Sequence, residues 1–122
     1  MREILFRGKQ ALTKEWIFGD LAHCENGLFM SDKEGNFVKV KPETVGQYTG
    51  LKDKNGTKIF EGDIVKIYLQ KNTATTGFII YVNCLCRFAF VENGVPYGFD
   101  DTTTLEVIGN IHDNRELLEV DQ

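Results

Sequence analysis

Several features that would suggest a membrane, secreted or DNA-coating protein are missing from this sequence. Its longest apolar run, Phe78 to Val82, is far shorter than the roughly 20 residues of a membrane-spanning helix. Residues Met1 to Arg7 lack the apolar core of a signal peptide. The cysteine count of three is odd, which argues for reduced thiols rather than paired disulfides. We therefore expect a protein of the cytoplasm that makes no contact with a membrane.

Charge of one sign is also scarce. The formal net charge is only −4, and the sequence contains no long basic run. Non-specific DNA binding depends mainly on clustered lysine and arginine, so this chain lacks its usual source. Loops that would bind a nucleotide, such as the Walker motif or the dinucleotide-binding glycine motif, do not occur. These absences leave a local basic face as the remaining route to nucleic acid.

Short apolar runs separated by glycine turns are what the sequence does contain. It has 122 residues, 42% of them apolar, which suits one domain with its own core. Asn-Gly pairs occur at Asn26, Asn55 and Asn93, and they favour the positive φ angles of tight hairpins. The pair Gly35-Asn36 predicts a hairpin between 28–30 and 37–40. The pair at Asn93 predicts another between 85–91 and 95–99.

Three longer strands and one helix complete the expected elements. The run 63–70 alternates, so we expect Val65, Ile67 and Leu69 to face the interior. The run 77–82 is apolar throughout, and 104–111 predicts the last long strand. Further interior residues are expected among a set of four, namely Phe78, Ile80, Phe88 and Phe90. A short helix is predicted near the C-terminus, from a cap at Asp113 or Asn114 to Val120.

Candidate reactive side chains are few. Cys84 and Cys86 would share one face if they lay on a strand, and His23 with Cys24 could complete four metal ligands. Structural zinc sites have two Cys-x₂₋₄-Cys knuckles, so we interpret the thiols as buried core residues. A cysteine dyad with His23 or His112 has no motif to support it. We therefore predict no catalytic residue, no metal and no cofactor.

Basic and aromatic residues gather around one predicted turn. Lys52, Lys54 and Lys58 flank it, with Tyr48 before them and Phe60 after. Phosphate attraction together with base stacking is how many proteins bind single-stranded nucleic acid. The opposing interpretation is that both rings belong to the core and that Asp53 and Glu61 dilute the charge. A macromolecule-binding surface at these residues is thus a candidate.

The first part of the chain carries more apolar residues than two short hairpins can cover alone. Trp16, Phe18 and Phe29 are the most prominent. Exposed apolar patches commonly mark interfaces between proteins. We therefore expect these three residues to take part in self-association, making the protein a homo-oligomer.

One long stretch resembles the YopX protein family of phages and prophages. Residues 42–56 read PETVGQYTGLKDKNG and residues 60–65 read FEGDIV, close to the central pattern of that family. The opening REILFR and the closing EVIGNIHDN also resemble the family's ends. Departures are small: Phe60 replaces a common tyrosine, Leu5 a frequent lysine and Arg115 a frequent proline. The remaining regions, 8–36 and 71–101, match no fixed pattern.

The resemblance implies a mostly-β fold with an SH3-like small barrel in the C-terminal part. It also implies an N-terminal part that joins subunits, a setting in the bacterial host of a phage, and no catalytic residues. We expect a single domain over 1–122, with an N-terminal β-hairpin and association part at 1–41 and the barrel part at 42–122. The expected function is a non-enzymatic phage accessory protein that binds a host or phage protein. Nucleic-acid binding is the alternative, and a metalloprotein or enzyme the third.

Overall fold

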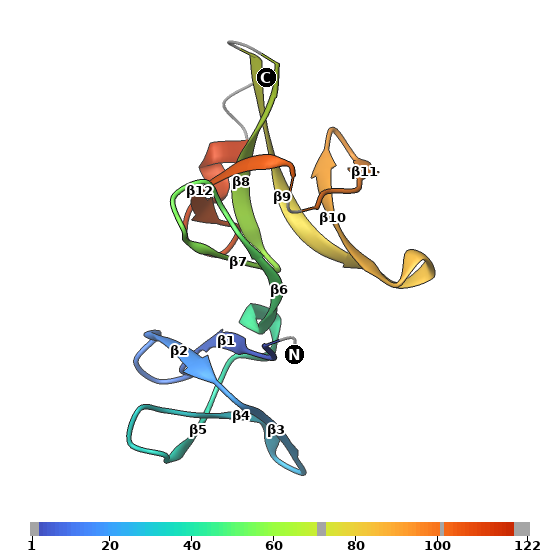
Figure 1. Ribbon diagram of the computed structural model, residues 1–122. Helices are drawn as coiled ribbons and strands as arrows, with labels where there is room; N and C mark the ends of the chain where they lie inside the picture. The colour runs from blue at the N-terminus through green and yellow to red at the C-terminus, as the bar shows by residue number, and fades with distance from the viewer. Residues whose placement is uncertain (1–2, 71–72, 101, 119–122) are drawn as a thin grey trace. The chain divides into compact units, whose positions relative to one another are not determined.

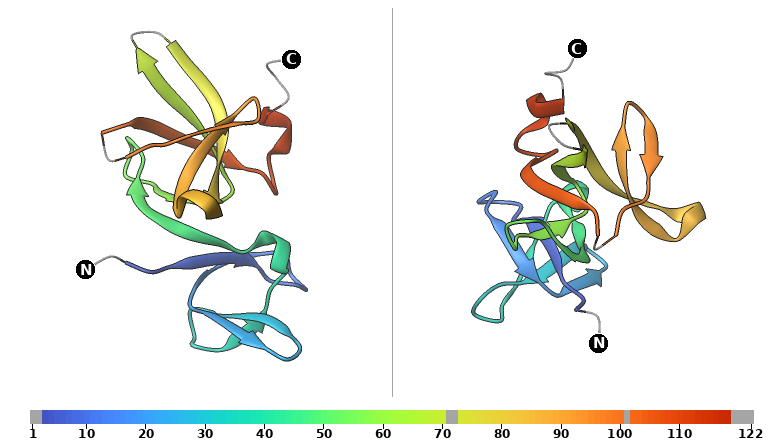
Figure 2. Two further views of the ribbon diagram at one scale, coloured as in Figure 1. Left: turned by 90° about the vertical axis from the view of Figure 1, so that its right-hand side faces the viewer. Right: turned by 45° about the horizontal axis from the view of Figure 1, so that its top comes forward.

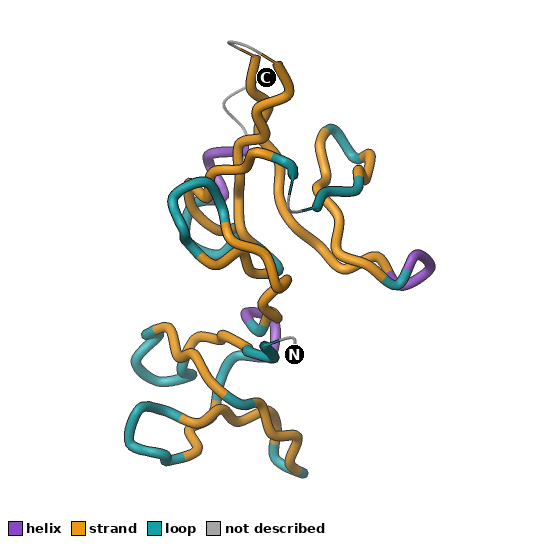
Figure 3. The backbone as a smooth tube through the Cα atoms, in the orientation of Figure 1, coloured by secondary structure: helices purple, strands orange, loops and turns teal. Residues whose placement is uncertain are grey.

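The chain forms two compact units, Met1–Tyr48 and Thr49–Gln122. The computed structural model describes residues 3–70, 73–100 and 102–118. Strands and loops make up nearly all of the described chain, interrupted by three 3-10 turns (Figure 3). Among these described residues no helix is long and apolar enough to cross a membrane. The boundary between the units lies later in the sequence than the division expected at Pro42.

Unit 1 consists of short antiparallel strands (Figure 1). Its elements are β1 (Phe6–Lys9), β2 (Trp16–Gly19), β3 (Leu21–Cys24), β4 (Gly27–Ser31), β5 (Phe37–Lys39), the 3-10 turn η1 (Pro42–Thr44) and the beginning of β6 (Gly46–Lys52). β1 lies between β2 and β6, while β3, β4 and β5 form a separate three-stranded sheet in that order. The predicted hairpin around Gly35 is confirmed as β4 and β5.

The interior of unit 1 forms around Met30 and Val40, which are 0% and 1% exposed. A Cβ at Gly8 would lie 3.0 Å from the Met30 sulfur, a tight contact, so glycine at this position favours the close approach of β1 to this methionine. Buried Thr44 connects η1 to β1, because its hydroxyl accepts a hydrogen bond of 2.8 Å from the Lys9 N–H. The same hydroxyl donates to the Lys41 carbonyl at 2.7 Å.

In unit 2, consecutive strands form an antiparallel meander, and the last strand, β12, returns to pair with β8 (Figure 2). It contains the rest of β6 and then β7 (Lys58–Phe60), β8 (Asp63–Gln70), β9 (Thr73–Val82), η2 (Asn83–Leu85), β10 (Arg87–Glu92), β11 (Val95–Tyr97), β12 (Thr104–Asn110) and η3 (Arg115–Leu118). The five-stranded sheet has the order β11-β10-β9-β8-β12. The predicted hairpin at Asn93-Gly94 is confirmed: Asn93 and Gly94 have φ angles of 52° and 80°.

One face of this sheet carries the core of unit 2. The buried cluster joins residues from five strands and a loop, namely Ile59, Val65, Ile67, Ile79, Phe90, Phe99 and Leu105. The expected interior places of Val65, Ile67 and Phe90 are confirmed, and Phe88 packs against the cluster from its edge. Ile79 occupies the place expected for Phe78 or Ile80, both only partly buried. The expected direction of Leu69 lies outside the described side chains.

Gly77 allows the core to pack tightly against β9. A side chain there would lie 2.6 Å from the Phe90 ring and would also collide with the Val91 carbonyl. Real Cβ atoms do not approach so closely, so the ring of Phe90 covers the backbone of Gly77 directly. The strand pairing agrees, because Phe90 stands opposite Ile79, two residues further along β9.

Two predictions for unit 2 need correction. The expected barrel is not closed within the described residues, because β11 pairs only with β10 and β12 only with β8. β11 has three residues and includes Pro96, which has no N–H to extend a ladder. The expected C-terminal helix is not confirmed either: residues Arg115–Leu118 form a single 3-10 turn. The remainder of that predicted helix, 119–120, lies outside the described residues.

Candidate functional site

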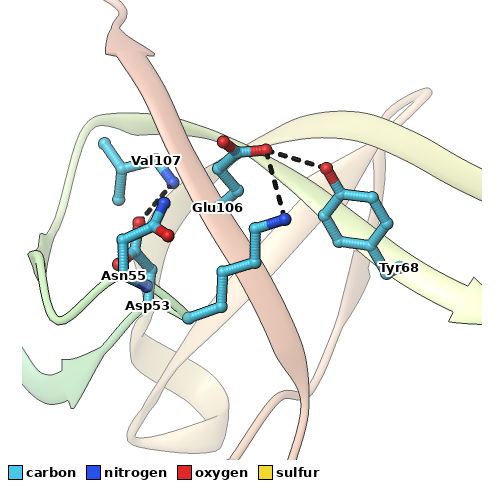
Figure 4. A network of polar contacts seen from close by, with 6 residues as sticks. Asp53, Asn55, Tyr68, Glu106 and Val107 are labelled. Carbon is cyan, nitrogen blue, oxygen red and sulfur yellow. Dashed lines mark hydrogen bonds and ion pairs between the residues drawn. The ribbon is translucent and has the colours of Figure 1, made fainter.

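The turn at Asp53–Thr57 lies against strand β12. The Lys54 N–H donates to the Leu105 carbonyl at 2.9 Å. The Val107 N–H donates to the Asp53 carboxylate, Oδ2, also at 2.9 Å (Figure 4). The turn thus supplies a carboxylate for the Val107 N–H and a backbone N–H for the Leu105 carbonyl, two groups on the edge of β12 that the sheet leaves available. The turn therefore covers this edge, as native sheets commonly require.

Asp53 shapes the turn from within. Its Oδ1 accepts hydrogen bonds from the backbone N–H groups of Asn55 and Thr57 at 2.8 and 2.9 Å. Burial raises the pKa of this carboxyl, but the bonds from Val107, Thr57 and Asn55 together with the nearby Lys54 charge outweigh it, so the pKa is lowered overall. Hydrogen bonds that favour the charged form have this effect. Asp53 is therefore a structural anion.

Beside Asp53, three side chains form a polar cluster on the surface of unit 2 (Figure 4). The Tyr68 hydroxyl donates to Glu106 Oε1 at 2.8 Å. The Lys54 ammonium lies 3.9 Å from the same oxygen and 4.5 Å from the centre of the Tyr68 ring. The aromatic partner of Lys54 is therefore Tyr68. The paired strands β8 and β12 position Tyr68 and Glu106, and the turn at 53–57 brings Lys54 to them.

The residues predicted to bind nucleic acid do not form one surface of charges and rings. Tyr48 and Phe60 are 6% and 4% exposed, so neither has a ring face open for stacking. Lys52 and Lys54 are exposed, and Lys58 is partly buried. The opposing interpretation, in which both rings are core residues, explains their burial. Only the charged half of the predicted surface remains accessible.

The residues predicted to mediate self-association lie on different strands of unit 1. Trp16 and Phe18 are on one face of β2, and Phe29 is on β4. The Arg7 guanidinium lies 4.8 Å from the centre of the Trp16 ring and the Lys9 ammonium 5.5 Å, so two cations cover this partly buried indole. Phe18 is 54% exposed. Phe29 is partly buried on the outer face of the β3-β4-β5 sheet.

The same outer face of the β3-β4-β5 sheet contains an aromatic residue that the sequence analysis missed. Strand register places Ala22, Phe29 and Lys39 in one row, and Phe37 opposite Ser31 in the next. Phe37 is 56% exposed, whereas Met30 on the inner face is 0% exposed. The alternation around Phe37 was visible in the sequence, but only the register shows that it joins Phe29. The outer face of unit 1 is defined here by five residues of this sheet: Ala22, Phe29, Ser31, Phe37 and Lys39.

The cysteines correct a prediction. Cys24, Cys84 and Cys86 are all exposed, not buried in a core. Cys84 and Cys86 lie in and after the turn η2, and Cys86 has a left-handed backbone at φ 53°, so they do not share one face of a strand. His23 and Cys24 are on β3 of unit 1, and His112 follows β12. Across the part of the chain that is described, no three His, Cys, Asp or Glu residues gather to hold a metal ion.

A cavity on the core-bearing face of unit 2 was not predicted. It has a volume of about 390 Å³, and its lining comes from β8, β9, β10, β11 and the loop after β11. The lining residues are Ile67, Thr75, Phe90, Glu92, Tyr97, Gly98 and Thr103. No local pattern joins these residues, because they become neighbours only when four strands pair in register. We call this space the β11 cavity.

Comparisons with known proteins add a family and a structural relative. The sequence model of the family described as YopX protein matches residues 5–119. A crystal structure of protein EF1440 from Enterococcus faecalis is similar, with a TM-score of 0.61 and 26% sequence identity. The alignment covers 97% of this chain and 99% of that chain. No curated protein matches the sequence.

Proposed function

The chain belongs to the YopX protein family, and from that premise we propose that it is a non-enzymatic phage or prophage accessory protein that self-associates and binds a host or phage macromolecule. The observation that carries this proposal is the outer face of unit 1. Phe37 exposes more than half of its surface beside Phe29, on a sheet whose other face carries the fully buried Met30. Apolar area of this kind is typical of contact surfaces.

A second copy of the chain is the partner that this face suits. Sheet faces with aromatic and small side chains can pack on their own copies, since a two-fold contact uses the same patch twice. Lys39 contributes its apolar stem as well, because its Cε lies 3.2 Å from the position that a Cβ of Gly27 would take. Its ammonium can then stay in water at the rim. A macromolecule of host or phage origin would bind elsewhere on the assembly.

The positions of the candidate reactive side chains support a non-enzymatic role. The candidate thiols and imidazoles belong to different elements: β3, η2 and the segment after β12. The buried carboxylates of Asp53 and Asp63 both accept hydrogen bonds from backbone N–H groups. We also propose that unit 2 is an SH3-like module with an open sheet. The meander from β8 to β11 and the return of β12 to β8 support that relation.

Light scattering after size-exclusion chromatography tests self-association. We expect the wild-type protein to have at least twice the mass of one chain at micromolar concentration, and Phe37→Ser to shift it toward the monomer. Leu12→Ser is the matched control, because Leu12 is 91% exposed but lies outside the outer face of unit 1. A monomeric wild-type protein, or equal effects of both variants, would contradict the proposal.

Nucleic-acid binding is the second candidate, and the exposed charges of Lys52 and Lys54 favour it. The ion pair of Lys54 with Glu106 and the burial of both predicted rings weaken it. Binding of a fluorescent single strand at low and high salt is the test, with Lys52→Gln as the variant. Phosphate contacts must weaken steeply as salt rises. Failure to bind at low salt would exclude this function.

A further inference from the structure

We propose that the β11 cavity binds an arginine side chain of a partner polypeptide, together with an adjacent apolar residue. This inference rests on the proposed function as a binding module, and it identifies a contact for the unknown macromolecule. All of the lining residues belong to unit 2. Three properties of the cavity carry the inference: an apolar floor, an aromatic rim and a single charge.

The floor and rim of the cavity are hydrocarbon and aromatic. Phe90 and Ile67 form the floor, and they are 1% and 4% exposed because they also belong to the core cluster. Tyr97 forms the rim and is 49% exposed. It stands directly opposite Phe90 in the β10–β11 hairpin. A ligand therefore meets a rigid floor and an accessible ring, the usual combination in small binding pockets.

Among the described residues of the lining, Glu92 is the only charged one. It is partly buried at the end of β10, and within the described parts of the chain no lysine or arginine comes within ion-pair distance of it. A carboxylate with reduced access to water attracts a cation more strongly than an exposed one does. The cavity is thus complementary to a positively charged group.

The hydroxyl groups of the lining narrow the choice of cation. Thr103 Oγ1 already accepts a hydrogen bond from the Asp100 N–H at 3.1 Å and donates to Asp100 Oδ1 at 3.4 Å. Thr75 on β9 is partly buried, and its hydroxyl is an acceptor on the far side of the cavity from β11. The hydroxyl oxygens of Thr75 and Thr103, beside the Tyr97 ring, suit a planar guanidinium, which donates hydrogen bonds in several directions and stacks on aromatic rings.

The surroundings favour a polypeptide as the source of that group. Val95 and Tyr97 on β11 are 47% and 49% exposed, so apolar surface continues from the cavity along the edge of the sheet. A residue next to the arginine can pack on Val95 while the guanidinium enters the cavity. The chain's own Arg87 does not fill this role. Its guanidinium lies over Gly98, and its Nη2 is 3.4 Å from the Phe99 carbonyl.

A pair of peptides that differ only in charge tests the proposal. N-acetyl-Leu-Arg-Leu-amide is titrated into the full-length protein, and amide chemical shifts are followed by NMR. The matched control is the peptide with citrulline, which has nearly the same shape but is neutral. We expect saturable shifts at Thr75, Gly98 and Thr103 with the arginine peptide, and binding at least about ten times weaker with the citrulline peptide, the size of one charge-assisted contact.

Protein variants locate the contact. Glu92→Gln should weaken binding of the arginine peptide by about tenfold, and Tyr97→Ala should weaken it too. Glu116→Gln, which removes a carboxylate from η3 outside the cavity, should leave binding unchanged. Equal binding of both peptides, an unaffected Glu92→Gln variant, shifts confined to other residues, or no binding at millimolar peptide would each overturn the proposal. Self-association of the wild-type protein is measured separately, so its failure would be distinguishable.

Discussion

Single residues hold the turns of this protein in place, and Asp53 is the best example. One buried carboxylate accepts three backbone hydrogen bonds, two within its own turn and one from β12. The turn at Asn55-Gly56 could be predicted from its Asn-Gly pair. The third donor, Val107, is 54 residues away, and this contact depends on the tertiary fold.

We predict that Asp53→Asn lowers the free energy of unfolding by about 1–3 kcal/mol at neutral pH. Asparagine keeps one acceptor oxygen but places an NH₂ group against a backbone donor. Urea denaturation followed by circular dichroism measures the loss. Asp20→Asn is the control, because Asp20 is exposed. Equal stability of the Asp53 and Asp20 variants would contradict the prediction.

The same residue predicts a dependence on pH. The pKa of Asp53 is lowered in the folded protein, so the folded state favours its charged form. The resulting stabilisation is complete above the ordinary aspartate pKa of about 4, and it is lost as the pH falls through the lower folded value. The urea midpoint of the wild-type protein should therefore fall between pH 5 and pH 3 more than that of Asp53→Asn. Parallel curves would argue against this contribution.

Gly62 is the second residue on which local geometry depends. Its φ angle of 93° lies in the region that other residues avoid, and it connects three segments. Its N–H donates to the Ile79 carbonyl at 2.8 Å, and its own carbonyl accepts from the Ile111 N–H at 2.9 Å. The corner before β8 is thus a backbone junction, and Asp63 supports it by accepting a hydrogen bond from the Phe60 N–H at 2.7 Å.

We predict that Gly62→Val destabilises the protein by more than about 1–2 kcal/mol, the usual strain of a left-handed backbone with a side chain. Valine is a severe test because its branched Cβ crowds the backbone. Gly62→Asn serves as the comparison, since asparagine tolerates positive φ better. The two urea midpoints should fall in the order wild type, asparagine, valine. An unchanged urea midpoint in the valine variant would contradict the prediction that this junction requires glycine.

At the scale of elements, β11 is an edge strand that cannot easily recruit another strand. Glu92 and Val95 flank the two-residue turn, so their backbone groups point toward each other, and so do those of Phe90 and Tyr97. Pro96 then occupies the outward position, where it offers no N–H. This arrangement protects the edge that the open sheet leaves uncovered.

We predict that Pro96→Thr increases association through β11, because it restores an outward donor on a residue that favours strands. The measurement is the mass by light scattering over several days, relative to the wild-type protein. Val95→Thr is the control, since its N–H already points toward β10. A stable mass for Pro96→Thr, or an equal increase in both variants, would show that the proline does not protect this edge.

Elements with local signals were predictable, and those that depend on distant contacts were not. The hairpins at Gly35 and Asn93 follow from residues that tolerate positive φ. The turn at Asn83–Leu85 was missed, because a left-handed cysteine at Cys86 has no signature in sequence. The burial of Tyr48 and Phe60 depends on packing rather than on spacing. The β11 cavity required the register of four strands, and no local pattern indicates that register.

At the scale of the whole molecule, each unit has buried residues of its own. Met30 and Val40 lie in unit 1, and the seven-residue core cluster lies entirely in unit 2. Stability is often uneven in such chains, with contiguous segments that open separately. The single domain expected from length alone therefore contains two groups of residues that can respond differently to mutation.

We predict that Met30→Ala, which removes a fully buried side chain, destabilises unit 1 by about 2–5 kcal/mol. Hydrogen exchange measured by mass spectrometry should accelerate in residues 5–48 more than in residues 49–118. Ile59→Ala, at a fully buried position of unit 2, should show the reverse pattern. Uniform acceleration along the chain in both variants would mean that the units unfold as one.

The limit between the units falls inside β6, whose residues 46–48 belong to unit 1 and residues 49–52 to unit 2. Truncation at this limit would sever a continuous strand instead of a linker. An N-terminal fragment ending at Tyr48 would lose the rest of β6, and a fragment beginning at Thr49 would start with a new charged amine in the middle of it. Genetic dissection of this protein should therefore keep all of 46–52 in both fragments.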